Sequence, residues 1–257
     1  MKTVAIIQAR MGSSRLPGKM LLSLADTPVI QWVYNRTCKI AGLDDVLVAT
    51  TIASQDDSLA DYCMAHKIPV VRGSENDVLD RYYQAAQAVK ANVVMRITGD
   101  CPLIDPVESA KVLNLFLKTP GCDYASNIHP PFLPDGLDTE VALVKTLCRV
   151  WRDVHEPAAR EHVTYFFHQH PECFHMATVT GTEDFSHHRW TLDNQEDYNF
   201  LAVVTDELKH RGQFGYLNEV LAVLRDRPEL MMLNYHIQRN EGLRKSLEDQ
   251  KVIEHMP

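Results

Sequence analysis

The chain has 257 residues, of which 45% are hydrophobic and 23% are charged, and its formal net charge at pH 7 is −8. This composition is ordinary for a globular chain with a substantial core, and the negative charge disfavours general binding to nucleic acid. No apolar run approaches the roughly 18 residues that span a membrane, and the first residues lead into a strand rather than a signal peptide. We therefore expect a cytoplasmic protein with no nucleic-acid and no membrane partner.

The first 116 residues alternate between short apolar runs rich in β-branched residues and amphipathic segments with helical spacing. Repetition of strand, helix and strand predicts an α/β fold with a mainly parallel sheet, helices on both faces and right-handed crossovers. The predicted strands lie at 4–9, 46–50, 68–71 and 93–97, and the predicted helices lie at 28–41, 55–66 and 77–91.

A loop with two glycines and three basic residues follows the first predicted strand, and the helical spacing resumes at residue 28. Open α/β sheets bind anions at the carboxyl ends of their strands, where the backbone amides of such a loop lie. The basic side chains could neutralise a triphosphate, and the small residues would let amides approach it. A solvated basic turn is the alternative. The residues concerned are Arg10, Arg15 and Lys19, with Gly12 and Ser13.

The glycine spacing of this loop does not match the two common nucleotide-binding motifs. A P-loop requires G-x-x-x-x-G-K-[ST], whereas five residues separate Gly12 from Gly18, and Met20 stands where the hydroxyl is required. The dinucleotide fingerprint G-x-G-x-x-G is also absent from the sequence.

After residue 116 the pattern becomes less regular. Residues 120–140 are rich in Pro, Gly, Asp and Asn, which predicts an ordered loop or an excursion from the sheet. The tail from residue 237 is polar, and we expect it to lie at the surface. The remaining predicted elements are helices at 142–152 and 157–169, strands at 175–180 and 189–192, and a helix from about residue 195.

Cysteine and histidine spacing argues against a zinc site or a disulfide framework. The six cysteines are scattered and form no C-x-x-C pair, so we expect reduced, mostly buried thiols. His168, His170, His187 and His188 lack a metal-ligand pattern, and we expect them at the surface.

The loop 9-ARMGSSRLPGK-19 resembles the signature loop of the cytidylyltransferases that activate sugar acids, including the acylneuraminate and 3-deoxy-manno-octulosonate enzymes. The resemblance is closest to the branch named for a spore coat polysaccharide biosynthesis protein, and it covers nearly the whole chain. Further similar segments are 73-GSENDVLDRY-82, 96-RITGDCPLIDP-106, 134-PDGLDTEV-141, 160-REHVTYFF-167, 189-RWTLDNQEDY-198 and 240-NEGLRKSL-247.

This resemblance implies a three-layer, Rossmann-like nucleotide-diphospho-sugar transferase fold. It also implies a Mg²⁺-dependent enzyme that joins CMP from CTP to a sugar or sugar-acid acceptor, releases pyrophosphate and serves the synthesis of a surface glycan. Because related cytidylyltransferases are dimers, we expect a homodimer. The expected organisation is a single nucleotidyltransferase domain over residues 1–257, with a dimerisation and acceptor excursion at about 125–190.

Two aspartates are the implied magnesium ligands. Asp100 lies at the carboxyl end of a predicted strand, and Asp105-Pro106 after it forms a helix cap and first-turn proline. Magnesium beside a triphosphate takes one or two carboxylates, and the resemblance assigns it to Asp100 and Asp193. Taken by themselves, Asp100 is explained as a turn residue and Asp193 as a helix N-cap.

The resemblance also implies contacts with the two substrates. Residues 73–82 resemble the segment that lies against cytosine and ribose, although an ordinary helix start explains them equally well. Residues 134–141 and 160–162 are the candidates for the acceptor, although a plain turn and a solvated helix face are alternatives. The implied nucleotide-binding residues are Ala9, Arg10, Gly12, Ser13, Arg15, Lys19, Ser74, Arg81 and Gly99. The implied acceptor-binding residues are Asp138, Glu140, Arg160 and His162, and the catalytic roles fall to Arg15, Lys19 and Asp100.

Other functions remain open from the sequence. A glycosyltransferase could use the same kind of sheet and bind a nucleotide sugar, although no D-x-D motif lies in the first half of the chain. A non-catalytic nucleotide or sugar sensor is a second alternative, but both candidate metal aspartates are present. A transferase that uses another nucleoside triphosphate, or a phosphonate acceptor, is a third.

Overall fold

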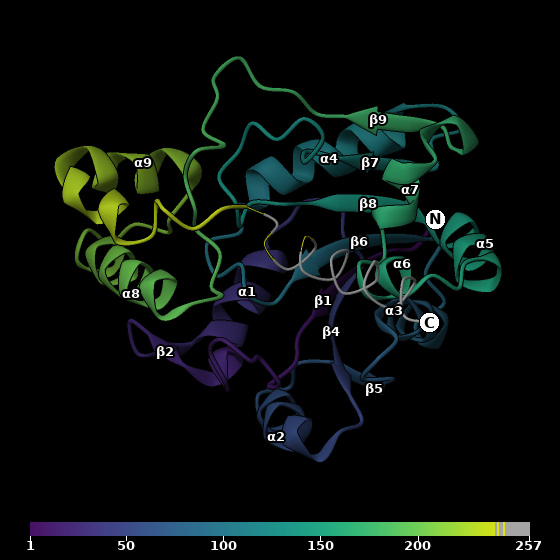
Figure 1. Ribbon diagram of the computed structural model, residues 1–257, viewed down its shortest axis with the longest axis horizontal. Coiled ribbons are helices and arrows are strands. Elements are labelled where there is room, and N and C mark those ends of the chain that lie inside the picture. Colours follow the sequence, from purple (N-terminus) through teal and green to yellow (C-terminus); the bar gives the residue numbers. More distant parts are fainter. Residues whose placement is uncertain (240, 242–243, 245–257) are drawn as a thin grey trace, which may run out of the picture.

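A computed structural model of the chain describes residues 1–239, 241 and 244. These residues form a central seven-stranded sheet, and a separate hairpin of β2 (Ser23–Leu24) and β3 (Thr27–Pro28). The sheet strands are β1 (Thr3–Gln8), β4 (Asp45–Thr51), β5 (Val70–Gly73), β6 (Val93–Thr98), β7 (Tyr124–Ser126), β8 (Glu140–Leu143) and β9 (Met176–Thr178). Their order is β5-β4-β1-β6-β8-β7-β9, and within the described residues every neighbouring pair is parallel except at β8, which is antiparallel to β6 and β7 (Figure 1).

Both faces of the sheet are buried, which explains why its central strands are almost continuously apolar. Alternate residues of β1 point to opposite faces: Ala5 and Ile7 join one apolar cluster, whereas Val4 and Ile6 join another. One face is covered by α1 (Val29–Thr37), α2 (Asp57–Ala65) and α4 (Pro106–Lys118). The other is covered by α3 (Val78–Ala88), α5 (Val144–Asp153), α6 (Pro157–Glu161) and α7 (Tyr165–Gln169). The predicted three-layer α/β architecture is confirmed.

Two further helices build a third apolar cluster beside the sheet. Helices α8 (Gln195–His210) and α9 (Leu217–Asp226) pack together and lie beside the β2 hairpin and α1, at the left of Figure 1. Trp190, which is almost fully buried, is part of this cluster together with Leu24 and Val29. The segment that enters α8 is therefore anchored next to the loops that end the central strands.

The strand order reverses at β1, so the junction of the β1 and β6 carboxyl ends is the switch point at which open α/β sheets bind ligands. Gln8 and Thr98 are register partners at these ends. Gly99 follows and donates its backbone N–H to the Gln8 carbonyl oxygen at 2.7 Å. A β-carbon at Gly99 would lie 2.8 Å from that oxygen and 2.9 Å from the Ala9 β-carbon. Gly99 is therefore needed for the close approach of the two strand ends.

Some predicted elements differ from the observed ones. The loop after β1 leads into a 3₁₀ turn, Lys19–Leu21, and the β2–β3 hairpin before α1 begins. Residues 120–140, predicted as a loop, contain β7, a strand of three residues inside the main sheet. Residues 189–192 are not a strand, because Arg189 forms an isolated bridge with Asp135 and the apolar residues after it pack against α8 and α9.

The predicted helix over 157–169 is interrupted. It forms the two short helices α6 and α7, and Val163 between them has a φ of 37°, which a continuous helix does not allow. By contrast, Asp105 caps α4 and Pro106 is its first residue, as predicted.

The six cysteines all lie within the described residues and are free, but Cys38 and Cys173 are exposed, so the thiols are less buried than predicted. In the described part of the chain, no helix combines the length and apolar character that crossing a bilayer requires.

Arg36 ties α1 to two loops at the edge of the third cluster. The side chain is 1% exposed and donates to the carbonyl oxygens of Ile104 at 2.7 Å and Gly215 at 2.6 Å, and also to those of Leu103 and Phe214. Burial lowers the pKa of Arg36 to about 10, so the guanidinium stays protonated at neutral pH.

Replacing this guanidinium by an apolar side chain should destabilise the fold. Arg36→Met leaves buried carbonyl oxygens without donors, and we expect the free energy of unfolding to fall by about 3 kcal/mol or more, with a drop in melting temperature of about 10 °C. Urea and thermal unfolding measure both quantities. Arg225→Met, at an exposed position on α9, is the control and should change stability by less than about 0.5 kcal/mol. Equal effects of the two substitutions would contradict this role of Arg36.

Candidate active site

The carboxyl ends of β1 and β6 open into a cavity of about 470 Å³. The loop after β1 forms one wall, the end of β6 forms the floor, and the segment that enters α8 forms the opposite wall. Nine of the residues predicted for substrate or metal binding line this cavity. They are Ala9, Arg10, Gly12, Ser13, Arg15, Lys19, Asp100, His162 and Asp193.

The loop after β1 is an ordered turn that folds back on itself. Gly18 donates its backbone N–H to the Met11 carbonyl oxygen at 3.1 Å and has a φ of 73°, which favours glycine. Met11 in turn donates its N–H to Asp56 at 2.6 Å. Asp56 is fully buried and also accepts the N–H of Thr51, so it fixes the loop to the end of β4.

Lys19 lies between the two candidate metal ligands. Its Nζ is 2.9 Å from Asp100 Oδ2 and 2.9 Å from Asp193 Oδ1, and it also donates to the Leu192 carbonyl oxygen at 2.8 Å. Burial disfavours the charged form of Lys19, but both carboxylates outweigh burial and raise its pKa above 10.5. Burial also opposes ionisation of Asp100, and Lys19 reverses this effect, so the pKa of Asp100 lies below 3.8. Lys19 is therefore a buried charged residue and not part of a solvated turn.

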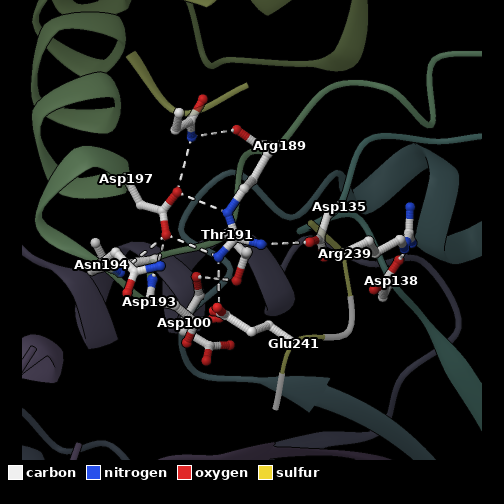
Figure 2. A network of polar contacts seen from close by, with 12 residues as sticks. Asp100, Asp135, Asp138, Arg189, Thr191, Asp193, Asn194, Asp197, Arg239 and Glu241 are labelled. Carbon is white, nitrogen blue, oxygen red and sulfur yellow. Dashed lines mark hydrogen bonds and ion pairs between the residues drawn. The ribbon is translucent and has the colours of Figure 1, made fainter. Parts of the chain in front are cut away.

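A buried network holds Asp193 in this position (Figure 2). Asn194 is the N-cap of α8, so Asp193 precedes the cap and is not the cap itself. The Asp197 carboxylate is fully buried and accepts the backbone N–H groups of Asp193 at 2.9 Å and Asn194 at 3.0 Å. Arg189 binds Asp197 at 2.8 Å and reaches Asp193 at 3.3 Å and Asp135 at 2.9 Å. Burial would lower the pKa of Arg189, but Asp197 and its neighbours raise it.

Arg15 is the outer cation of the site. Its Nη2 lies 3.2 Å from Asp193 Oδ1, and its Nη1 pairs with Glu241. The Arg15 side chain is 34% exposed, whereas the Lys19 side chain is 9% exposed. The cavity therefore holds one buried cation, Lys19, and one more accessible cation at its rim, Arg15.

A second cavity of about 300 Å³ adjoins the first. Arg96, Thr98 and His162 line both cavities. Asp138 and Glu140 line the second cavity, as do His129, His168 and Arg239. Two of the four predicted acceptor-binding residues thus line the second cavity and not the first, and His162 stands at the junction of the two.

A chain of polar contacts crosses the wall of the second cavity. The Tyr124 hydroxyl donates to Glu140 Oε1 at 2.5 Å and is 3.0 Å from His168 Nε2, while Glu140 Oε2 pairs with Arg96. Burial opposes ionisation of Glu140, but Arg96 and the hydrogen bonds lower its pKa below the ordinary value. The expectation that His168 lies at the surface is wrong, because its side chain is 14% exposed and its ring lies tilted against that of His129 with centroids 3.8 Å apart.

Other predicted site residues lie outside both cavities in the described part of the chain: Ser74, Arg81, Gly99 and Arg160. Ser74 accepts the N–H of Asp77 at 3.1 Å, next to the start of α3. Arg160 binds the same Asp77 at 3.0 Å, which joins α6 to α3. Arg81 is fully buried and donates to the Ser74 carbonyl oxygen, while its Nε and Nη2 have no partner in the described residues.

Several residues of the site were not singled out from the sequence. Arg96, Arg189 and Asp197 lie inside segments that carry the family resemblance, so these segments could have marked them as candidate site residues. Asp56 and Arg239 lie outside those segments, and no local pattern distinguishes them from ordinary polar residues. Their roles appear only through contacts between segments that are distant in sequence.

Comparisons with known proteins identify the family to which the chain is similar. A family model described as cytidylyltransferase matches residues 4–237. The spore coat polysaccharide biosynthesis protein SpsF of Bacillus subtilis is 31% identical over 87% of this chain and 94% of its own length. The 3-deoxy-manno-octulosonate cytidylyltransferase of Trichlorobacter lovleyi is 36% identical over 47% of each chain. Among solved structures, a cytidylyltransferase from Leptospira borgpetersenii superimposes with a TM-score of 0.84 and 29% identity, covering 90% of this chain and 97% of that one.

Asp138 should make stability depend on pH. Burial raises its pKa from 3.8 to about 7, Arg239 opposes the rise, and Asp135 and Glu140 add to it. Between these two pH values the folded protein binds more protons than the unfolded chain, so this group's contribution to the free energy of unfolding falls as pH rises and is lost above about pH 7.

The Asp138→Asn variant lacks this titration. Its free energy of unfolding, relative to that of the original chain, should therefore increase by more than about 1 kcal/mol between pH 4 and pH 7.5. Urea unfolding at several pH values measures the difference. Asp206→Asn removes an exposed carboxylate from α8 and is the matched control, with a small change expected. Parallel pH profiles for the original chain and Asp138→Asn would contradict the raised pKa.

Proposed function

Because the chain belongs to the cytidylyltransferase family and is therefore a nucleotidyltransferase, we propose that it transfers CMP from CTP to an oxygen of a sugar or sugar-acid acceptor. The acceptor oxygen attacks the α-phosphorus and forms a new P–O bond. The bond from the α-phosphorus to the oxygen that bridges the β-phosphorus breaks, and pyrophosphate leaves with that electron pair. The proton of the acceptor hydroxyl passes to solvent.

The observation that carries this proposal is the convergence of Lys19, Asp100 and Asp193 at the junction of the β1 and β6 ends. A buried cation and two carboxylates stand beside a loop whose backbone can approach phosphate, which is the arrangement that phosphoryl transfer requires. The larger cavity has room for the nucleotide, and the second cavity offers a separate space for the acceptor.

Each basic residue of the loop has a defined task in this proposal. Lys19 binds the phosphates as a compact charge, and Arg15 at the rim stabilises the negative charge that develops on the leaving pyrophosphate. Arg10, Gly12 and Ser13 line the same wall and contact the phosphates. Because Asp193 and Glu241 hold Arg15 in the absence of nucleotide, the triphosphate replaces carboxylate partners.

Magnesium is the proposed cofactor, and Asp100 and Asp193 are the residues that would hold it. Their oxygens already flank one cation, the ammonium of Lys19, at 2.9 Å each. A pair of carboxylates suits a cation that takes one or two of them and completes its shell with phosphate and water. When bound, Mg²⁺ neutralises phosphate charge and aligns the reacting oxygens.

Arg81 and Ser74 are proposed to support recognition of the base indirectly. Arg81 is fully buried, and neither residue lines either of the two cavities in the described part of the chain, so neither is placed to contact the base. The hydrogen bond from Arg81 to the Ser74 carbonyl oxygen fixes the segment before α3 instead. Ala9 lines the larger cavity and is proposed to lie beneath the phosphates, whereas Gly99 acts indirectly by allowing the close approach of β1 and β6.

The acceptor is proposed to occupy the second cavity, in contact with Asp138, Glu140 and His162. Arg160 acts indirectly, since its guanidinium joins α6 to Asp77 at the start of α3.

We further propose that the activated sugar serves a surface polysaccharide. The chain would form one domain and dimerise through the segment at about 125–190, by analogy with related cytidylyltransferases.

Ligand-dependent thermal unfolding tests the proposed donor. CTP with Mg²⁺ at about 100 times its dissociation constant should raise the melting temperature by about 5–10 °C, because such binding adds about 2.7 kcal/mol. UTP, GTP and ATP should give smaller shifts. A shift with a nucleoside diphosphate sugar, and with none of the triphosphates, would favour a glycosyltransferase instead.

Asp100→Asn provides the matched test of the metal site. The amide lacks the negative charge that Mg²⁺ requires, so the variant should keep its fold, lose the magnesium-dependent part of the CTP shift and lose turnover. Asp206→Asn is the control with the same chemical change at an exposed position, and its shift should match that of the original chain. Full magnesium dependence in Asp100→Asn would remove Asp100 from the mechanism.

A further inference from the structure

Arg96 has no assigned role in the site, yet it stands between the two cavities. It lies on β6 directly opposite Glu140 of β8, and the two side chains form an ion pair across the strands. Thr98, two residues further along, lies on the same face of the sheet, and both residues line both cavities. Arg96 is thus fixed to the sheet at the boundary between the nucleotide cavity and the acceptor cavity.

The ion pair orients the guanidinium of Arg96. Glu140 is 2% exposed and accepts a hydrogen bond from Nη1 of Arg96, and Tyr124 binds the other oxygen of the same carboxylate at 2.5 Å. Burial would lower the pKa of Arg96, but Glu140 outweighs burial and raises it. Arg96 therefore remains charged and has little freedom to rotate.

The opposite edge of the guanidinium is left without a partner. Nε of Arg96 is buried and makes no hydrogen bond, and no hydrogen bond from Nη2 to another described residue is found. Nε and Nη2 form the fork that binds two oxygens of a phosphate or carboxylate. A buried donor without an acceptor is destabilising, so a ligand oxyanion at this edge would remove an unfavourable feature of the free protein.

One group of the proposed reaction must lie at the boundary between the cavities. The α-phosphoryl group is bonded to the nucleoside on one side and becomes bonded to the acceptor on the other. Lys19 and Arg15, which bind the remaining phosphates in the proposed function, line the first cavity and not the second. Arg96 lines both spaces and is therefore suited to the group that is transferred between them.

We propose that Arg96 binds the α-phosphoryl group of the nucleotide with its Nε–Nη2 edge, while Glu140 and Tyr124 act as positioning residues for that guanidinium. This inference rests on the proposed function. It adds a fourth basic group to Arg10, Arg15 and Lys19, and it acts on the phosphoryl that stays with the product rather than on the pyrophosphate that leaves. Binding of CMP, which carries this phosphoryl group alone, should therefore depend on Arg96.

The test compares binding of CMP and cytidine by isothermal titration, because the two probes differ only in the phosphoryl group. In Arg96→Gln, affinity for CMP should fall by about tenfold or more, while affinity for cytidine stays the same. Removing Arg96 also leaves Glu140 as a buried, unpaired charge, which can unfold the protein. The paired variant Arg96→Gln/Glu140→Gln keeps a neutral contact between the strands. We expect it to lose the same part of the CMP preference, by which we mean the ratio of the affinity for CMP to the affinity for cytidine.

Arg72→Gln is the matched control. Arg72 lies on β5, binds Asp57 at 2.7 Å and lines neither of the two cavities in the described residues, so its loss should leave the CMP preference unchanged. The inference is overturned if the paired variant, folded by thermal unfolding, prefers CMP over cytidine as strongly as the original chain does. If the original chain binds neither CMP nor CTP, the proposed function itself fails.

Discussion

The site depends on one buried electrostatic arrangement, in which the ammonium of Lys19 separates the carboxylates of Asp100 and Asp193 at 2.9 Å from each. Two carboxylates that share one site repel each other, and a cation between them removes this repulsion. Lys19 lowers the pKa of Asp100 and joins the loop after β1, the end of β6 and the entry to α8. In our account, the free enzyme is thereby held ready for a divalent cation that arrives with the nucleotide.

The surrounding structure serves to keep these charges in place. Arg189 and Asp197 are almost fully buried, and each is stable there because the other neutralises it and because backbone N–H groups satisfy the carboxylate. Gly99 allows β1 and β6 to end within hydrogen-bonding distance, and Asp56 fixes the loop to β4. Gly99, Asp56 and Asp197 thus fix the positions of the loop after β1, the end of β6 and the start of α8, which together form the walls of the larger cavity.

Local patterns predicted the parallel half of the fold, because its strands and helices are long enough to show their own periodicity. They did not predict β7, whose three residues lie in a segment rich in Pro, Gly and Asp. Residues 189–192 look like a strand because Trp190 and Leu192 are apolar, but these side chains pack against α8 and α9. The resemblance pointed to Lys19, Asp100 and Asp193, yet their contact spans 174 residues between Lys19 and Asp193 and follows from tertiary structure alone. Arg239 and the fork of Arg96 were beyond prediction for the same reason.

The most direct measurement is a crystal structure of the protein with CTP and Mn²⁺ in place of Mg²⁺, with anomalous scattering used to locate the metal. Our account predicts a metal peak bound by Asp100 and Asp193, with the Lys19 ammonium moved from between them onto the phosphates. Bound CTP with Lys19 still bridging the two carboxylates, and with no metal at Asp100 or Asp193, would contradict it.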